Sequence, residues 1–262
     1  MEQHNADAIR QVEREAWDRA APAFSDNGAK LTAHAVGDLI EAASITVGCR
    51  ALEIGCGPGH VTKRLAEAGA EATGVDLAPA MVAVARRSHP ELSFEVADAE
   101  ELPFDDDTFD VVLINFAIHH LPQPARACEE IYRVLVEGGR FVFAGPIEQF
   151  GFGAFIEGLS AHHTMDDLPH GPIYLGATRE DYVKLVKNAG FGAYDVTVRQ
   201  ITLQLGSLEP LLVSGWEICA LDRLSAETQD KIRATTIEKA APYKTDQGYA
   251  FPDQILVGVA TK

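Results

Sequence analysis

The feature that most constrains the fold is the alternation of short apolar segments with helical patterns between residues 49 and 146. The helical patterns cover residues 60–68, 79–88 and 125–137, and a proline opens the second and the third. Strands that alternate with helices of this length form a parallel sheet with helices on both faces. The apolar segments, which we predict to be strands, are 51–54, 72–75, 92–96, 109–114 and 140–144.

The pattern loosens after residue 146. Residues 147–177 are rich in glycine, histidine and aspartate and predict an irregular insertion, which a helix over 179–189 follows. Residues 194–205 alternate as a strand does, 207–243 are helical in pattern, and 254–260 form a last strand. A late strand, a helical insertion and a terminal strand predict an antiparallel pair at the edge of the parallel sheet.

These patterns predict an α/β protein with a doubly wound, mostly parallel, seven-stranded Rossmann-like sheet. Its last strand is antiparallel, and its helical insertions form a lid. We expect a single domain in three parts. Residues 1–47 are N-terminal helices, interrupted near Pro22 and residues 25–28, that pack on the core. Residues 48–146 form the strand–helix core, and residues 147–262 complete the sheet and supply the lid.

The charge balance limits the partners of the chain. Its 22 basic and 39 acidic side chains give a net charge of −17. Such an excess of acid disfavours nucleic acids and anionic membrane surfaces, since both bind through cationic side chains. A leader peptide or membrane span is not expected, and the four cysteines lack metal-like spacing. We therefore expect a cytoplasmic protein with free thiols and a small-molecule substrate, and the sequence leaves the oligomeric state open.

A glycine-rich loop joins the first strand to the first helix of the core. Gly55 and Gly57 match the start of the dinucleotide-binding pattern G-x-G-x-x-G, but the third glycine falls at position 59 and position 60 is His. The spacing therefore disfavours a nicotinamide cofactor. The alternatives are that the loop is a tight turn without a ligand and that Glu53 only anchors the loop backbone.

Polar side chains follow the next strands. Asp76 ends the second strand, Asp98 follows the third, and Asn115 ends the fourth. The carboxyl ends of parallel strands meet at one edge of a sheet, where ligands of open α/β folds bind. There, the Asp76 carboxylate can accept ribose hydroxyls, Leu77 can pack on an adenine face, and Asp98 can accept from an exocyclic amine.

Four ordered motifs carry a family resemblance. They are Leu-Glu-Ile-Gly-Cys-Gly-Pro-Gly at 52–59, Gly-Val-Asp-Leu-Ala-Pro-Ala-Met at 74–81, Ala-Asp-Ala-Glu-Glu-Leu-Pro-Phe at 97–104 and Phe-Asp-Val-Val at 109–112. With them, residues 51–145 resemble the core of class I S-adenosylmethionine-dependent methyltransferases. Within that class they are most similar to the small-molecule group that includes the ubiquinone- and menaquinone-pathway enzymes.

The resemblance implies S-adenosyl-L-methionine as the cofactor and assigns each motif residue a part of it. The loop would lie against the methionine moiety, the acid after the second strand would bind the ribose, and the following residues would surround the adenine. The cofactor-binding residues implied are Glu53, Gly55, Cys56, Gly57, Asp76, Leu77, Met81, Asp98, Ala99 and Asn115.

Two histidines just beyond Asn115 are the candidates for catalysis. An imidazole in the 118–121 loop could take a proton from a hydroxyl or ring N–H of the acceptor. We favour His120 as the base, with His119 second. The alternative is that one of them packs under the loop while the other caps the next helix.

A second histidine cluster lies in the insertion, where His162 and His163 precede Asp166, Asp167 and His170. Adjacent histidine side chains diverge, so this cluster is interpreted as a substrate-lining lid rather than a metal site. His163 and Trp216 are the candidate substrate-binding residues, with a core position the alternative for Trp216. Residues 105–107, three consecutive aspartates, are interpreted as a solvated turn, and no metal is predicted.

The function that follows is transfer of a methyl group from S-adenosylmethionine to a small molecule by in-line displacement. Positioning and desolvation would do most of the catalysis, with a possible histidine base. The alternative is a homologue that binds the cofactor without transferring methyl and acts as a scaffold or non-transferring catalyst. O-, N- and C-methylation all stay open.

Overall fold

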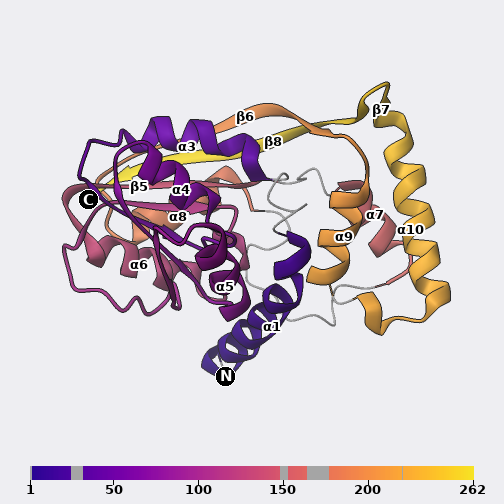
Figure 1. The fold of residues 1–262 in the computed structure, drawn as a ribbon, viewed down its shortest axis with the longest axis horizontal. Coiled ribbons are helices and arrows are strands. Elements are labelled where there is room, and N and C mark those ends of the chain that lie inside the picture. Colours follow the sequence, from indigo (N-terminus) through magenta and orange to yellow (C-terminus); the bar gives the residue numbers. More distant parts are fainter. Residues whose placement is uncertain (1, 25–31, 148–152, 164–176, 220) are drawn as a thin grey trace.

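The computed structural model describes residues 2–24, 32–147, 153–163, 177–219 and 221–262. Its centre is one twisted sheet with the strand order β3-β2-β1-β4-β5-β8-β6, and the two-residue strand β7 pairs with β8 (Figure 1). The core strands are β1 (Arg50–Ile54), β2 (Glu71–Asp76), β3 (Ser93–Val96), β4 (Phe109–Asn115) and β5 (Leu135–Pro146).

The core strands are parallel, and their order reverses beside β1. β1 pairs with β2 on one side and with β4 on the other, so that Ile54 lies between Val75 and Ile114. Because β2 leads outward to β3 and β4 leads outward to β5, the loops after β1 and β4 diverge. A crevice therefore opens at the carboxyl ends of these two strands.

The C-terminal strands confirm the predicted fold class and correct its details. β8 (Gly248–Thr261) is antiparallel to both of its neighbours, β5 and β6 (Ala193–Leu205). The last strand is therefore inside the sheet, and β6 occupies the edge. β8 begins at residue 248 rather than 254, because the register with β6 extends along the whole of β6 to Tyr249. β7 (Lys244–Thr245) extends the pairing further.

Helices cover both faces of the sheet because side chains alternate along each strand. Val112 and Ile114 of β4 face α6 (Pro124–Val134) and α8 (Arg179–Asn188). Val111 and Leu113 face α3 (Val36–Ala43) and α4 (His60–Glu67). α6 ends earlier than predicted, at Val134. The next residue, Leu135, is extended, begins β5 and pairs with Phe109 of β4.

Three helices gather at one end of the molecule, beyond the core strands (Figure 1). α7 (Gly153–Ser160), α9 (Glu209–Ile218) and α10 (Ala226–Ala240) share an apolar cluster with the ends of β6 and β8. Phe155, Leu211, Ile232 and Phe251 are buried in it. Over the part of the chain that the structure describes, no helix is both long enough and apolar enough to span a membrane.

The N-terminal helix α1 (Glu2–Ala23) runs between α5 (Pro79–Ser88) and α9 and touches both (Figure 1). Asp18 of α1 accepts a hydrogen bond from the Ala80 backbone N–H at 2.8 Å, and so satisfies one unpaired donor at the start of α5. Ala21 and Trp17 pack against Met81. The interruption predicted near Pro22 is wrong, since α1 continues through Pro22 to Ala23, and the predicted break at 25–28 lies outside the described residues.

An ion-paired side chain anchors α6 to the segment that follows β3. Glu130 is buried, accepts a hydrogen bond from the Leu102 N–H at 2.9 Å, and receives two more from the Arg133 guanidinium. These bonds, chiefly those from Arg133, hold the pKa of Glu130 below its ordinary value. The negative charge of Glu130 therefore stabilises the fold at neutral pH, and this stabilisation is lost as the pH falls through the lowered pKa.

We expect Glu130→Gln to lower the free energy of unfolding by about 1–2 kcal/mol at pH 7, because a charged hydrogen bond is lost at a buried position. Urea denaturation at pH 7 and at progressively lower pH measures it, and the difference from the native chain should shrink on acidification. Glu129→Gln is the control, since Glu129 is exposed on the same helix. Equal losses in the two variants would contradict the anchoring role.

Candidate functional site

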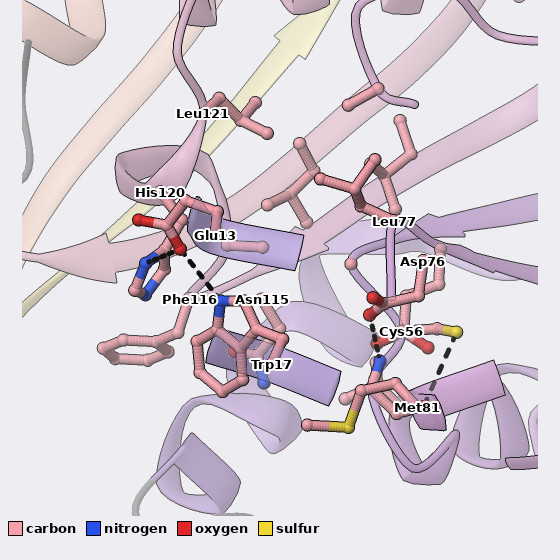
Figure 2. A pocket seen from close by; sticks show the side chains of 18 of the residues that line it. Glu13, Trp17, Cys56, Asp76, Leu77, Met81, Asn115, Phe116, His120 and Leu121 are labelled. Atoms are coloured by element: carbon pink, nitrogen blue, oxygen red, sulfur yellow. Dashed lines mark hydrogen bonds and ion pairs between the residues drawn. The ribbon is translucent and has the colours of Figure 1, made fainter. Parts of the chain in front are cut away.

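A pocket lies at the carboxyl ends of β1, β2 and β4, where the strand order reverses (Figure 2). Its empty space, part of it open to solvent, is about 1000 Å³. Asp76, Leu77 and Met81 lie on one side in the close view, and Glu13 and His120 on the other. The pocket therefore has walls from the core and a cover from α1.

The glycine loop brings its backbone to the floor of this pocket. Gly55 has a φ of +69°, and a Cβ at that position would lie 2.4 Å from the Cβ of Ala117. Gly57 also has a positive φ, of +49°. Only glycine meets both the conformation and the close approach to the loop after β4 at residue 55. Gly55 and Gly57 thus bring backbone atoms rather than side chains to the floor of the pocket, as a ligand held against the backbone requires.

Asp76 connects the end of β2 to the glycine loop. One carboxylate oxygen accepts the Gly57 N–H at 2.8 Å, and the other accepts the Ala78 N–H at 2.9 Å. Burial raises the pKa of Asp76, and these two hydrogen bonds oppose the rise. Each carboxylate oxygen has two lone pairs, so both can accept a further donor from the pocket.

Glu53 and Cys56 line the pocket from the loop but are directed into the protein. Glu53 is buried and bonded to the Thr62 hydroxyl of α4, so it joins β1 to α4 rather than holding the loop backbone. Burial raises the pKa of Glu53 to about 8. Burial also raises the pKa of the Cys56 thiol well above its usual range. Neither group is arranged as a nucleophile.

Asp98 and Ala99 border the far end of the pocket, with Leu77 and Met81 nearby. One oxygen of Asp98 accepts the Glu100 N–H at 2.9 Å, and the other lies 2.5 Å from Nε of Arg10. Arg10 also bonds to the buried Glu100 at 2.5 Å. A helix at the N-terminus therefore contributes the cation that pairs with these two core carboxylates.

Asn115 ends β4 at the centre of the crevice. Its side-chain oxygen is buried and has no hydrogen-bond partner among the described residues. A buried acceptor without a donor costs about 1–3 kcal/mol, so such an atom at the wall of a pocket points to a polar ligand.

The structure separates the two histidines of the 118–121 loop. His120 lines the pocket, and its Nδ1 lies 3.1 Å from a carboxylate oxygen of Glu13. The same oxygen accepts the Trp17 indole N–H at 3.1 Å (Figure 2). His119 is not among the described residues that line the pocket, and burial lowers its pKa well below the usual range. Of the two candidates, only His120 faces the space where a ligand would bind.

The N-terminal part of the site was not predicted from sequence. Arg10, Glu13 and Trp17 share one face of α1, three and four residues apart, and all line the pocket. A signal for this part of the site was present in the sequence, because two charged residues and a tryptophan lie on the packed face of an amphipathic helix. Their partners Asp98 and His120 lie in the core, far away in sequence.

Most of the predicted substrate lid lies outside the described residues, which omit 148–152 and 164–176. Asp166, Asp167 and His170 belong to the omitted residues. His163 follows α7 and is not among the described residues that line the pocket. His162 bonds to the Thr235 hydroxyl of α10 at 2.8 Å. Trp216 belongs to α9, and its side chain is also outside the description.

Comparison with known proteins agrees with the geometry. Residues 52–143 match the family described as methyltransferase domain. A demethylmenaquinone methyltransferase of Paenarthrobacter aurescens is 34% identical over 106 residues, which cover 40% of this chain and 42% of that protein. The match thus spans less than half of the relative's length.

Two solved structures extend the similarity beyond this segment. The YcgJ protein of Bacillus subtilis superposes with a TM-score of 0.64 and 22% identity, over 88% of this chain and 98% of that one. A phosphoethanolamine N-methyltransferase of Haemonchus contortus, solved with S-adenosyl-L-methionine, gives a TM-score of 0.56 at 24% identity. It covers 87% of this chain and 52% of that one.

The fold and the site thus define a Rossmann-like methyltransferase domain. Residues 52–143 match the methyltransferase-domain family, and this core is similar to the class I S-adenosylmethionine-dependent methyltransferases of the menaquinone-pathway group. The resemblance drawn from the four sequence motifs is confirmed.

Proposed function

We propose that this protein transfers a methyl group from S-adenosyl-L-methionine to a small-molecule acceptor. The observation that carries the proposal is the pocket at the switch point of the sheet. Its glycine loop and Asp76 are tied together by a hydrogen bond, within the segment that matches the methyltransferase domain. Such a crevice is where ligands of this fold class bind.

The residues around the crevice fit the cofactor. A Cβ at Gly57 would lie 4.0 Å from Phe24, so the loop has room for a ligand there, and the unpartnered oxygen of Asn115 can accept from the amino group of the methionine moiety. The oxygens of Asp76 can accept from two ribose hydroxyls while they keep their backbone bonds. Glu53 would hold the end of β1 on α4, and Cys56 would support the loop from beneath.

The adenine would lie toward the α5 end of the pocket. Leu77 and Met81 supply apolar surface for its ring, and Ala99 borders its edge. Asp98 would accept from the exocyclic amine with the oxygen that now lies beside Arg10. Arg10 can keep its bond to Glu100 while sharing Asp98 with the ligand.

The cover of the pocket indicates the class of acceptor. Trp17, Phe24, Phe116 and Leu121 present aromatic and apolar surface, whereas Glu13, Asp76 and Asp98 place carboxylates around it. An anionic acceptor would be repelled by these carboxylates and by the net charge of −17. We therefore propose a small, largely apolar acceptor that is neutral or cationic.

The cofactor supplies an electrophilic methyl group on its sulfonium when bound. The chain would orient the acceptor against the methyl group, which can lower the activation barrier by about 7–11 kcal/mol. It would also exclude water from the space beneath α1. For an acceptor hydroxyl or acidic N–H, His120 would remove the proton, a contribution of about 10²–10⁴-fold.

Label transfer tests the proposal. The purified chain is incubated with methyl-labelled S-adenosylmethionine and a fractionated extract of small metabolites, and label is expected to move to a low-molecular-weight product. Calorimetry with S-adenosylhomocysteine measures cofactor binding separately. Binding without label transfer would favour the alternative of a non-transferring homologue, and absence of binding would contradict both functions.

A further inference from the structure

Glu13 is a buried acid that the methyl-transfer proposal does not explain. Only 8% of its surface is exposed, and it lies on α1, outside the matched domain. A carboxylate is costly to bury unless hydrogen bonds compensate it. One of its oxygens takes part in two such hydrogen bonds, with Trp17 Nε1 and His120 Nδ1 each 3.1 Å away.

The chemistry of these three groups determines where the protons lie. The indole N–H of Trp17 can only donate, and an ionised carboxylate can only accept. Nδ1 of His120 must therefore carry a proton to bond to Glu13. In the neutral imidazole the other nitrogen, Nε2, then holds the lone pair.

The neighbouring rings limit how His120 can turn. The Trp17 ring meets that of His120 edge to face, with centroids 5.0 Å apart, and the His119 ring lies 4.2 Å away. Among the described residues, the charged groups that act on His120 include Glu13 and, at longer range, Asp76. Glu13 also acts on Cys219, just beyond α9, so it stands where α1 meets the helical end of the molecule.

We propose that Glu13 is a positioning residue that holds His120 as the Nδ1–H tautomer, with Nε2 as the basic atom. The inference rests on the proposed methyl transfer for its purpose. In that reaction the acceptor O–H or N–H bond would break, its proton would bond to Nε2, and its electron pair would form the bond to the methyl carbon. The sulfur–methyl bond would break at the same time, and its electron pair would stay on sulfur, which leaves as a neutral thioether. The Glu13 carboxylate would stabilise the resulting imidazolium, as the acid does in a catalytic triad. α1 thereby becomes part of the acid–base apparatus.

Nitrogen NMR of the ligand-free protein tests the tautomer directly. The protein is labelled with ¹⁵N-histidine, and His120→Gln identifies the resonances of His120 among the nine histidines. We expect the neutral imidazole of His120 in the native chain to carry its proton at Nδ1. Protonation at Nε2 alone would overturn the proposal.

The variants separate positioning from a structural role. Glu13→Ala removes the acceptor, and we expect His120 to lose the Nδ1–H form. Glu13→Gln keeps an acceptor oxygen and should restore it in part. Glu15→Ala removes an exposed acid from the same helix and should leave the spectrum unchanged. An unchanged His120 tautomer in Glu13→Ala would overturn the assignment.

Steady-state kinetics of the Glu13 variants give a second test, with the acceptor identified by label transfer as the substrate. We expect Glu13→Ala to lower kcat about 10-fold or more, with a smaller change in KM, and Glu13→Gln to recover part of the loss. A change in KM alone would overturn the positioning role. Calorimetric titration of the native protein with S-adenosylhomocysteine keeps the two proposals apart, because failure to bind would contradict methyl transfer without altering the tautomer measured in the free protein.

Discussion

Replacing Asp76 by Ala is expected to weaken binding of S-adenosylhomocysteine about 10- to 100-fold. The variant removes the two oxygens that would accept the ribose hydroxyls, and hydrogen bonds to a charged group contribute about 1.5–3 kcal/mol. It also frees the Gly57 and Ala78 N–H groups that shape the loop. Isothermal titration calorimetry measures the change.

Two further variants make this result specific. Asp76→Asn keeps one acceptor oxygen and is expected to lose less affinity than Asp76→Ala. Asp105→Ala removes an exposed acid from the turn after β3 and is expected to bind as the native chain does. Thermal unfolding of each variant shows whether the loop, rather than the binding contact, is lost. Native affinity in a folded Asp76→Ala would refute the placement of the ribose.

Because burial raises the pKa of Asp76, its charge is lost at a higher pH than that of an exposed aspartate. Acceptance from two ribose hydroxyls needs the carboxylate, so cofactor affinity should fall as the pH is lowered through this raised pKa. Titrations over a pH series should show the decline in the native protein. A parallel decline in Asp76→Ala would assign it to another group.

Replacing His120 by Ala is expected to lower kcat by about 100-fold for an acceptor that must lose a proton. A general base acts on the transition state, so the affinity for S-adenosylhomocysteine should change little. The native profile of rate against pH should fall on the acid side, where the imidazole is protonated, and this limb should disappear in the variant. Steady-state kinetics over a pH series measure both effects.

His162→Ala is the matched control, since His162 bonds to Thr235 of α10 and is not among the described residues that line the pocket. It should retain the native kcat and pH profile. If His120→Ala keeps the full rate and the acid limb, no base acts there. Positioning and desolvation would then provide the whole of catalysis.

Local sequence patterns were sufficient for the core of the fold. The predicted strand over 72–75 and the helix over 79–88 match β2 and α5 closely, because a short apolar segment, period-3.6 burial and a proline at the helix start are local properties. The same holds for the site's floor. Gly55 adopts a positive φ and Asp76 ends its strand, as residues of these types do after strands of an open sheet.

Local sequence patterns do not predict which distant segments pair with each other. The sequence predicted that the last strand is antiparallel, but its insertion between β5 and β6 depends on which backbone edge it meets. The choice between His119 and His120 also depended on tertiary contacts. Adjacent side chains have equivalent sequence signals, and only the packing of the loop places His120 in the pocket.

Residue conformation and periodicity within a few positions specify the strand–helix alternation, the glycine loop and the acid at the end of β2. The role of α1 in completing the site depends instead on tertiary packing. Arg10 finds Asp98 and Glu100, and Glu13 finds His120, across long stretches of chain. A local pattern shows that a helix face is buried but not which groups it meets. That depends on the summed packing of α1 against α5 and α9.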